Sequence, residues 1–158
     1  MNLERSLEMA RQLRDELAAE VERARAERQL IRTLDAAALF TRASERGAFV
    51  AEVARLEREL SLALGRAAGT AGLVAGTLER LEALAPEATQ VLKGVLSEVR
   101  SLASALQEID RLNLKLADRA LACVRGYVEA LRPSVRAYDR RGLRGTSAPA
   151  LAMVSSKG

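Results

Sequence analysis

The chain has 158 residues, of which 49% are apolar and 29% charged, a composition that suits one folded domain and excludes both a disordered chain and an integral membrane protein. It contains no histidine, no tryptophan and a single cysteine, which excludes a cysteine–histidine zinc site, a histidine-activated nucleophile and an internal disulfide. The net charge is +4, but residues 132–158 alone carry +5, so the rest of the chain is nearly neutral.

The charge distribution and the few aromatic residues argue against nucleic-acid binding, which needs a basic folded face and stacking rings. The first residues are charged and lack a continuous apolar core, so no secretory signal is expected. The longest uncharged stretch before residue 130, residues 67–78, is too short to cross ~30 Å of hydrocarbon. We therefore expect a cytoplasmic protein that is not inserted in a membrane.

The first predicted element is a helix over residues 3–33. An apolar residue recurs every seven positions, and others widen the same stripe: Leu3, Leu7, Ala10, Leu13, Leu17, Val21, Ala24, Ile31 and Leu34. Oppositely charged residues three apart, such as Glu20/Arg23 and Glu22/Arg25, indicate that the other face is solvated.

Asp35 is a predicted N-cap for a new start at Ala36, which gives either a short helical turn or a kinked continuation. A second apolar stripe follows: Phe49, Val53, Leu56, Leu60 and Leu64. The four glycines within residues 65–76 favour a loosened helix end and a turn, because glycine costs ~1 kcal/mol relative to alanine inside a helix. The alternative is a smooth ridge along which another helix can approach closely.

A shorter helix containing Leu73, Leu78, Leu81 and Leu84 is expected to end before Pro86, because the residue before a proline disfavours helical geometry. From Glu87 onward the longest periodic run predicts a helix that Pro133 kinks or ends. Its apolar residues step by three or four: Leu92, Leu96, Val99, Leu102, Leu106, Ile109, Leu112, Leu116, Ala120, Val124, Tyr127 and Leu131.

No strand-like alternation appears in the sequence. The predicted fold class is all-α: an elongated antiparallel bundle of three to four helices with a flexible C-terminal tail. The predicted domains are a helical bundle over residues 1–138 and a flexible basic tail over residues 139–158.

Catalytic chemistry has no support in these residues, so we expect no enzyme activity, no metal and no cofactor. The glycines lack the lysine and serine or threonine of a phosphate-binding loop, and the carboxylates fall on solvated helix faces. Cys123 is interpreted as a small buried hydrophobe rather than a reactive thiol.

Binding to another protein remains as a function. A large apolar face at the end of the last helix either caps the core or receives a partner, and it consists of Tyr127, Leu131, Val135 and Tyr138.

Three segments resemble the FlgN type of flagellar export chaperones. Residues 30–39, running into 46–49, are similar to the family's passage from a long first helix through an Asp-x-x-x-Leu turn into the second. Residues 109–116 (Ile-Asp-Arg-Leu-Asn-Leu-Lys-Leu) are similar to its Leu-Asn-rich stretch midway along the last helix. Residues 138–142 (Tyr-Asp-Arg-Arg-Gly) resemble its Tyr-x-x-x-Gly ending.

The resemblance implies a cytoplasmic chaperone that binds the C-terminal helices of hook–filament junction proteins, prevents their premature assembly and delivers them to the flagellar type III export gate. It places client binding on the last helix and its extension, at Leu116, Val124, Tyr127, Leu131 and Val135. It associates Tyr138 with docking to the export gate component. The tail after Gly142 would order on contact.

Two alternatives stay open. A structural coiled-coil or scaffold protein would act by oligomerisation, and a homodimer is possible for the chaperone as well. A helical protein associated with the nucleoid or a membrane surface would use the basic tail, and its binding would weaken steeply with salt.

Overall fold

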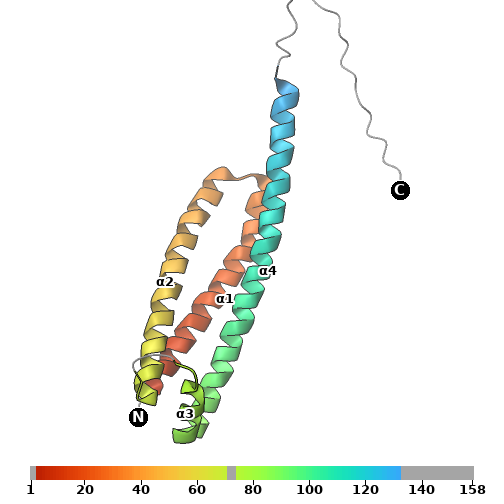
Figure 1. The fold of residues 1–158 in the computed structure, drawn as a ribbon. Helices are drawn as coiled ribbons and strands as arrows, with labels where there is room; N and C mark the ends of the chain where they lie inside the picture. The colour runs from red at the N-terminus through yellow and green to blue at the C-terminus, as the bar shows by residue number, and fades with distance from the viewer. Residues whose placement is uncertain (1–2, 71–73, 133–158) are drawn as a thin grey trace, which may run out of the picture. The chain divides into compact units, whose positions relative to one another are not determined.

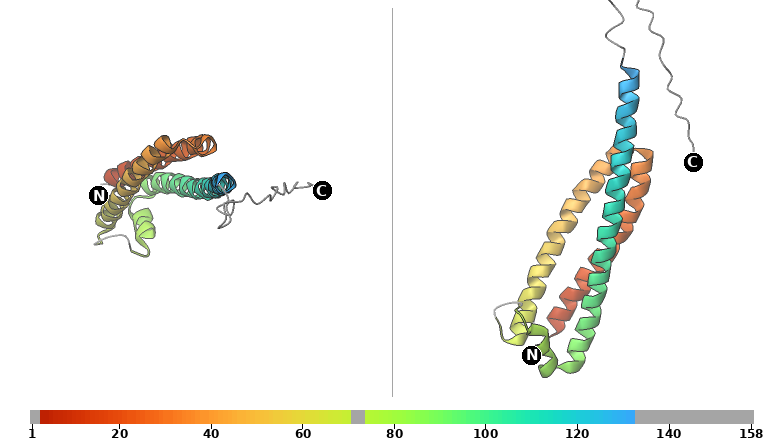
Figure 2. Two further views of the ribbon diagram at one scale, coloured as in Figure 1. Left: turned by 90° about the horizontal axis from the view of Figure 1, so that it is seen from above. Right: turned by 45° about the vertical axis from the view of Figure 1, so that its right-hand side comes forward.

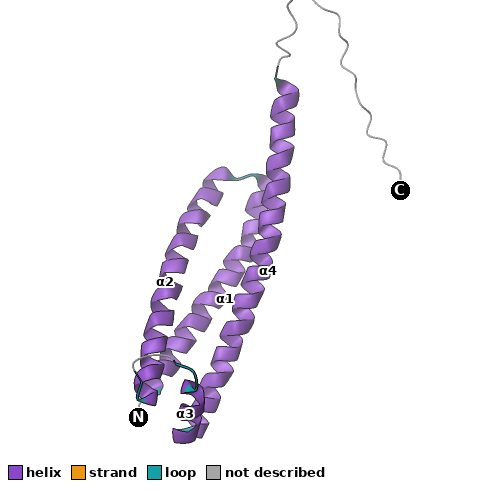
Figure 3. Ribbon diagram, viewed as in Figure 1, coloured by secondary structure: helices purple, strands orange, loops and turns teal. Residues whose placement is uncertain are grey.

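The computed structural model describes residues 3–70 and 74–132. These residues form helices and no strand: α1 (Glu4–Thr33), α2 (Ala36–Ala68), α3 (Thr77–Leu84) and α4 (Pro86–Leu131) (Figures 1 and 3). The chain divides into two compact units, Met1–Ala122 and Cys123–Gly158, with the division inside α4. The all-α class is confirmed, whereas the predicted boundary after residue 138 lies outside the described residues.

The turn between α1 and α2 takes only two residues. Leu34 adopts a left-handed conformation, with φ 54° and ψ 37°, and its N–H and that of Asp35 bond to the carbonyls of Ile31 and Leu30. The Asp35 carboxylate accepts a hydrogen bond of 3.0 Å from the Ala38 N–H, which confirms its predicted role as N-cap. From Ala36 the helix runs through to Ala68, so the residues after Asp35 begin one continuous helix.

Side-chain contacts define how the helices of the first unit run. Arg5 near the start of α1 lies 3.3 Å from Glu59 near the end of α2, and Glu20 further along α1 meets Arg42 near the start of α2. The two helices are therefore antiparallel, as Figures 1 and 2 show.

The first and last helices run in the same direction. Arg14 of α1 lies 3.5 Å from Glu98 of α4, and further along both helices Asn113 Nδ2 donates to the Ala24 carbonyl at 2.7 Å. Within the first unit, α2 is thus antiparallel to both of its long neighbours, and the short α3 connects it to α4 (Figure 2).

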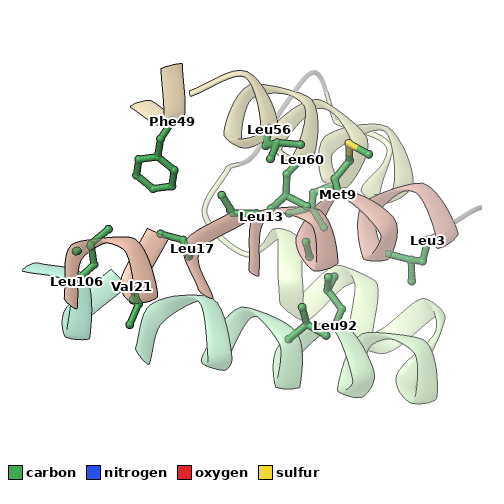
Figure 4. Close-up of a cluster of buried hydrophobic side chains, with 14 of the residues drawn as sticks. Leu3, Met9, Leu13, Leu17, Val21, Phe49, Leu56, Leu60, Leu92 and Leu106 are labelled. Atoms are coloured by element: carbon green, nitrogen blue, oxygen red, sulfur yellow. The ribbon is translucent and has the colours of Figure 1, made fainter. Parts of the chain in front are cut away.

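The predicted apolar stripes form the core. Figure 4 shows leucines of α1, α2 and α4 converging with Met9, Val21 and Phe49. The largest fully enclosed apolar side chains are those of Met9, Leu56, Leu81 and Leu92. Burial of such side chains stabilises the fold by about 1.5–3 kcal/mol each. In the stripe of α1, Leu34 differs from the prediction: it is 51% exposed, because it follows the end of α1 in the turn.

Glycines end the second helix and begin the third. Gly69 closes α2 with φ 73°, and Gly76 precedes α3 with φ 80°, conformations that glycine adopts without steric cost. The predicted turn is confirmed at these two positions, although α2 includes Gly65, and residues 71–73 lie outside the described part. Pro86 opens α4, as a first helical residue that needs no N–H.

The core register of α4 departs from the predicted run beyond Ile109. Leu92, Leu106 and Ile109 are buried, but the next buried residue is Asn113, while Leu112 is 41% exposed.

No helix in the described ranges is both long enough and apolar enough to cross a membrane.

Candidate binding site

The end of α4 exposes a row of large apolar side chains. In the second unit, Val124, Tyr127, Val128 and Leu131 are 39%, 69%, 51% and 65% exposed. Their spacing of three, one and three residues places them on one face of the helix. We call these four residues the α4-end face. Three of them are predicted partner-binding residues, and their exposure leaves them accessible to a partner.

The other predicted partner-binding residues lie elsewhere. Leu116 belongs to the first unit, where it is half-buried. Val135 and Tyr138 fall outside the described residues and stay predictions. Val128 was missed by the sequence analysis, although it lies four residues after Val124 and three before Leu131, the spacing of a shared helix face.

Exposed charged side chains accompany the α4-end face. These are Arg125, Glu129 and Arg132, and none of them forms an ion pair with another residue in the described ranges.

Cys123 corrects one expectation. The sequence favoured a small buried hydrophobe at this position, yet the thiol is exposed. The reason is that every residue of 121–132 is exposed, so this part of α4 offers no core for a cysteine to join.

A second surface lies wholly within the first unit, where the end of α1, the start of α2 and the middle of α4 meet. A groove of about 750 Å³ opens there, and we call it the end groove. Its apolar lining comes from both sides of the α1–α2 turn and from α4: Ile31, Leu34, Leu39, Ala43, Leu114, Ala117 and Ala120. Ile31 is buried, whereas Leu34 and Leu114 are 51% and 65% exposed, so large apolar side chains remain available in it.

Two arginines that line the end groove, Arg42 and Arg46, contact a buried carboxylate. Glu20 is fully buried and accepts hydrogen bonds from Arg42 and, at 2.8 Å, from Arg23. Arg46 Nη1 lies 3.6 Å from the same carboxylate. Removing a carboxylate from water costs several kcal/mol unless it is paired, and here three arginines compensate it. The predicted solvated face of α1 is therefore wrong at Glu20.

Arg46 joins this cluster to α4. It donates a hydrogen bond to Asp110, which raises the pKa of the Arg46 guanidinium; burial lowers that pKa, and the charges of Asp110, Glu20 and Glu27 raise it. The α2 start is thus tied to both α1 and α4 by ionic contacts.

Arg42 is incompletely satisfied. The residue is 6% exposed and lines the end groove, but its Nε and Nη1 atoms have no hydrogen-bond acceptor within the described structure. Glu27 Oε2 lies 3.4 Å from Nε and Glu45 Oε2 lies 3.8 Å from Nη1, which gives charge attraction without hydrogen bonds. Unmade hydrogen bonds of a buried donor are costly, so an acceptor brought by a ligand is favoured here.

Asn113 completes the base of the groove. Its amide donates to the Ala24 carbonyl and its oxygen accepts a hydrogen bond of 3.1 Å from Arg28 Nε. These directional bonds fix which part of α4 faces α1.

The end groove was not predicted from the sequence, although two signals pointed to it. Glu20 falls three residues after Leu17 and four before Ala24, and Arg42 falls seven before Phe49, so both charges sit on the apolar stripes of their helices. Leu114, Ala117 and Leu121 also form a second apolar row beside the one that was followed.

The site offers binding groups and no metal-ligand cluster: no group of three acidic or cysteine side chains in the described residues could hold a metal ion. A comparison with protein families matches residues 1–145 to the family described as "FlgN protein". No curated protein and no solved structure matches the chain.

Proposed function

The chain belongs to the FlgN family, which implies a flagellar export chaperone role, and we propose that its α4-end face binds the C-terminal helices of hook–filament junction proteins. The observation that carries this proposal is the exposure of Val124, Tyr127, Val128 and Leu131 on one face of a helix. An amphipathic client helix would cover these side chains, and burial of their apolar surface would drive the association.

The mechanism follows from this burial. The client helix ends are expected to pair with other helices in the assembled filament, so a chaperone that covers their apolar face prevents assembly. Binding alone is sufficient for this step. The complex would form in the cytoplasm and pass to the export gate component, with Tyr138 as the proposed docking residue and the tail after Gly142 ordering on contact.

The test is light scattering after size exclusion, with the chain alone and mixed with C-terminal peptides of the hook–filament junction proteins from its own genome. We expect a defined complex that is lost in Tyr127→Asp and Leu131→Asp, with helicity by circular dichroism unchanged. Leu84→Asp is the matched control, because Leu84 is 61% exposed, close to the 65% of Leu131, but lies on α3.

The opposite result favours the scaffold alternative. A stable dimer or higher oligomer of the chain alone, disrupted by Leu131→Asp and indifferent to the client peptides, would show that the α4-end face serves self-association. A homodimer that still binds the peptides would leave the chaperone proposal standing.

A further inference from the structure

We propose that the end groove binds an acidic amphipathic helix: one whose apolar stripe is flanked by carboxylates. The inference rests on the proposed function only for the origin of that helix, a client protein. The groove itself uses residues of the first unit and none of the α4-end face.

Leu34 is the first observation. A leucine in the left-handed region carries a steric cost of roughly 1–2 kcal/mol that a glycine would avoid, and glycine is the usual residue at this place after a helix. The leucine side chain is half exposed and lines the groove, so it gains little from the core in return. A strained position that holds an exposed apolar group at a groove is an indication of binding.

Arg42 is the second observation. Its Nε and Nη1 donors are buried beside the groove and lack acceptors. The lining arginines already face carboxylates: Arg42 and Arg46 meet Glu20, Glu27 and Asp110, and Arg111 pairs with Glu108, so the preference comes from the unmade hydrogen bonds of Arg42 and not from a surplus charge of the lining. A carboxylate on the incoming helix would supply the acceptor that Arg42 lacks.

Exposed basic side chains at the rim of the end groove add to its preference for an acidic helix. Arg32, Lys115 and Arg119 are exposed on the turns that carry the lining residues, and none forms an ion pair within the described ranges. The exposed carboxylates beside them are Asp118 on α4 and Asp35 in the α1–α2 turn, so basic side chains outnumber acidic ones here by three to two. Charge complementarity across an interface steers association and suppresses wrong partners, so this rim selects an acidic helix over a basic one.

Two other occupants are disfavoured by charge. The chain's own segment after residue 132 contains five basic residues and one acidic residue, and would meet the basic rim with like charge. The end of α4 from a second copy would bring Arg125 and Arg132 against Glu129, again a net positive charge. An acidic helix from another protein is the occupant that the groove fits.

The experiment uses fluorescence anisotropy with two synthetic helices of about four turns, both with leucine at positions a and d. One carries glutamate at the flanking e and g positions and the other lysine. We expect the glutamate peptide to bind at least about tenfold more tightly than the lysine peptide, and the difference to shrink with added salt.

Variants of the full chain locate the site. Leu114→Asp is expected to weaken the glutamate peptide about tenfold or more, while Leu84→Asp leaves it unchanged. Leu34→Gly is expected to weaken it as well, yet to keep or raise the melting temperature, because glycine relieves the left-handed conformation. A merely structural leucine would show the reverse: unchanged affinity and no gain of stability.

Equal binding of the two peptides, or unchanged affinity in both Leu34→Gly and Leu114→Asp, would overturn the inference.

Experiments with the natural client peptides distinguish a failure of this inference from a failure of the proposed function. A client complex that survives Leu114→Asp and Leu34→Gly but is lost in Leu131→Asp would leave the proposed function intact and remove the groove from it. Self-association through the groove, seen as a dimer that Leu114→Asp dissolves, would also overturn it.

Discussion

The two ends of the first unit are held by different interactions. Where α1 begins and α2 ends, side chains such as Met9, Leu56, Leu60 and Leu92 fill the space between the helices (Figure 4). Where α1 ends and α2 begins, buried polar groups lie among the apolar ones: Glu20 with its arginine partners, and Asn113.

The difference separates stability from recognition. Apolar packing is non-directional and fills the space between the helices at the first end. Ion pairs and hydrogen bonds need fixed partners, and at the second end they hold the helices while leaving apolar side chains exposed in the end groove. Four changes test this division, beginning with the largest expected effect.

Arg42→Ala should lower the free energy of unfolding by about 3–5 kcal/mol, because it removes one partner of the fully buried Glu20. Urea denaturation followed by circular dichroism measures the loss. Arg55→Ala, which breaks contacts to Glu52 and Glu59 on the surface, is the control and should cost much less. Equal losses in the two variants would contradict the structural role of the buried cluster.

Leu92→Ala should cost about 2–5 kcal/mol, because Leu92 is 1% exposed and its truncation leaves a cavity between α4 and its neighbours. The same denaturation measurement applies, with Leu84→Ala as the exposed counterpart. The loss should be insensitive to salt, whereas part of the Arg42→Ala effect should change with ionic strength. If the loss of stability in Leu92→Ala depended on salt, it would contradict the conclusion that apolar packing holds this end of the first unit together.

Asn113→Ala should cost about 1–3 kcal/mol, because it removes a buried hydrogen-bond donor and leaves Arg28 without its side-chain acceptor. Hydrogen exchange of the neighbouring α1 and α4 amides should rise together. If stability and exchange stay unchanged, Asn113 does not fix the register of α4 against α1.

The smallest effect concerns surface carboxylates. A hydrogen bond from Arg111 holds the pKa of Glu108 below its ordinary value of 4.5, and one from Arg55 does the same for Glu52. A carboxyl whose pKa is lower in the folded state stabilises the protein at neutral pH and loses this contribution as the pH falls below 4.5. The small difference in melting temperature between the parent chain and Glu108→Gln should therefore vanish in acid, and a difference that grows in acid would contradict this pairing.

The sequence predicted the helices well because their apolar spacing is regular. The stripe from Leu3 to Ile31, the cap at Asp35 and the break at Pro86 are all local signals, and the structure confirms each. Local spacing also indicated the exposed face around Tyr127, although only the structure shows its exposure.

The end groove could not be predicted in the same way. Glu20 and Arg23 look like a surface pair in the sequence, and only the approach of Arg42 from another helix explains why the carboxylate is buried. Similarly, Leu34 continues the apolar stripe of α1 in sequence, but the left-handed turn carries it out of the core. Tertiary contacts overrode the local pattern at both positions.

The parallel course of α1 and α4 has a consequence for the order of folding. The contacts between these helices join residues 84–89 apart, whereas α1 and α2 are connected by a two-residue turn. Closing a long loop costs more chain entropy than closing a short one, so the α1–α2 hairpin is expected to form first, also during synthesis. For as long as α4 is unfinished, that hairpin presents the uncovered apolar side of α1, a surface through which newly made chains can associate.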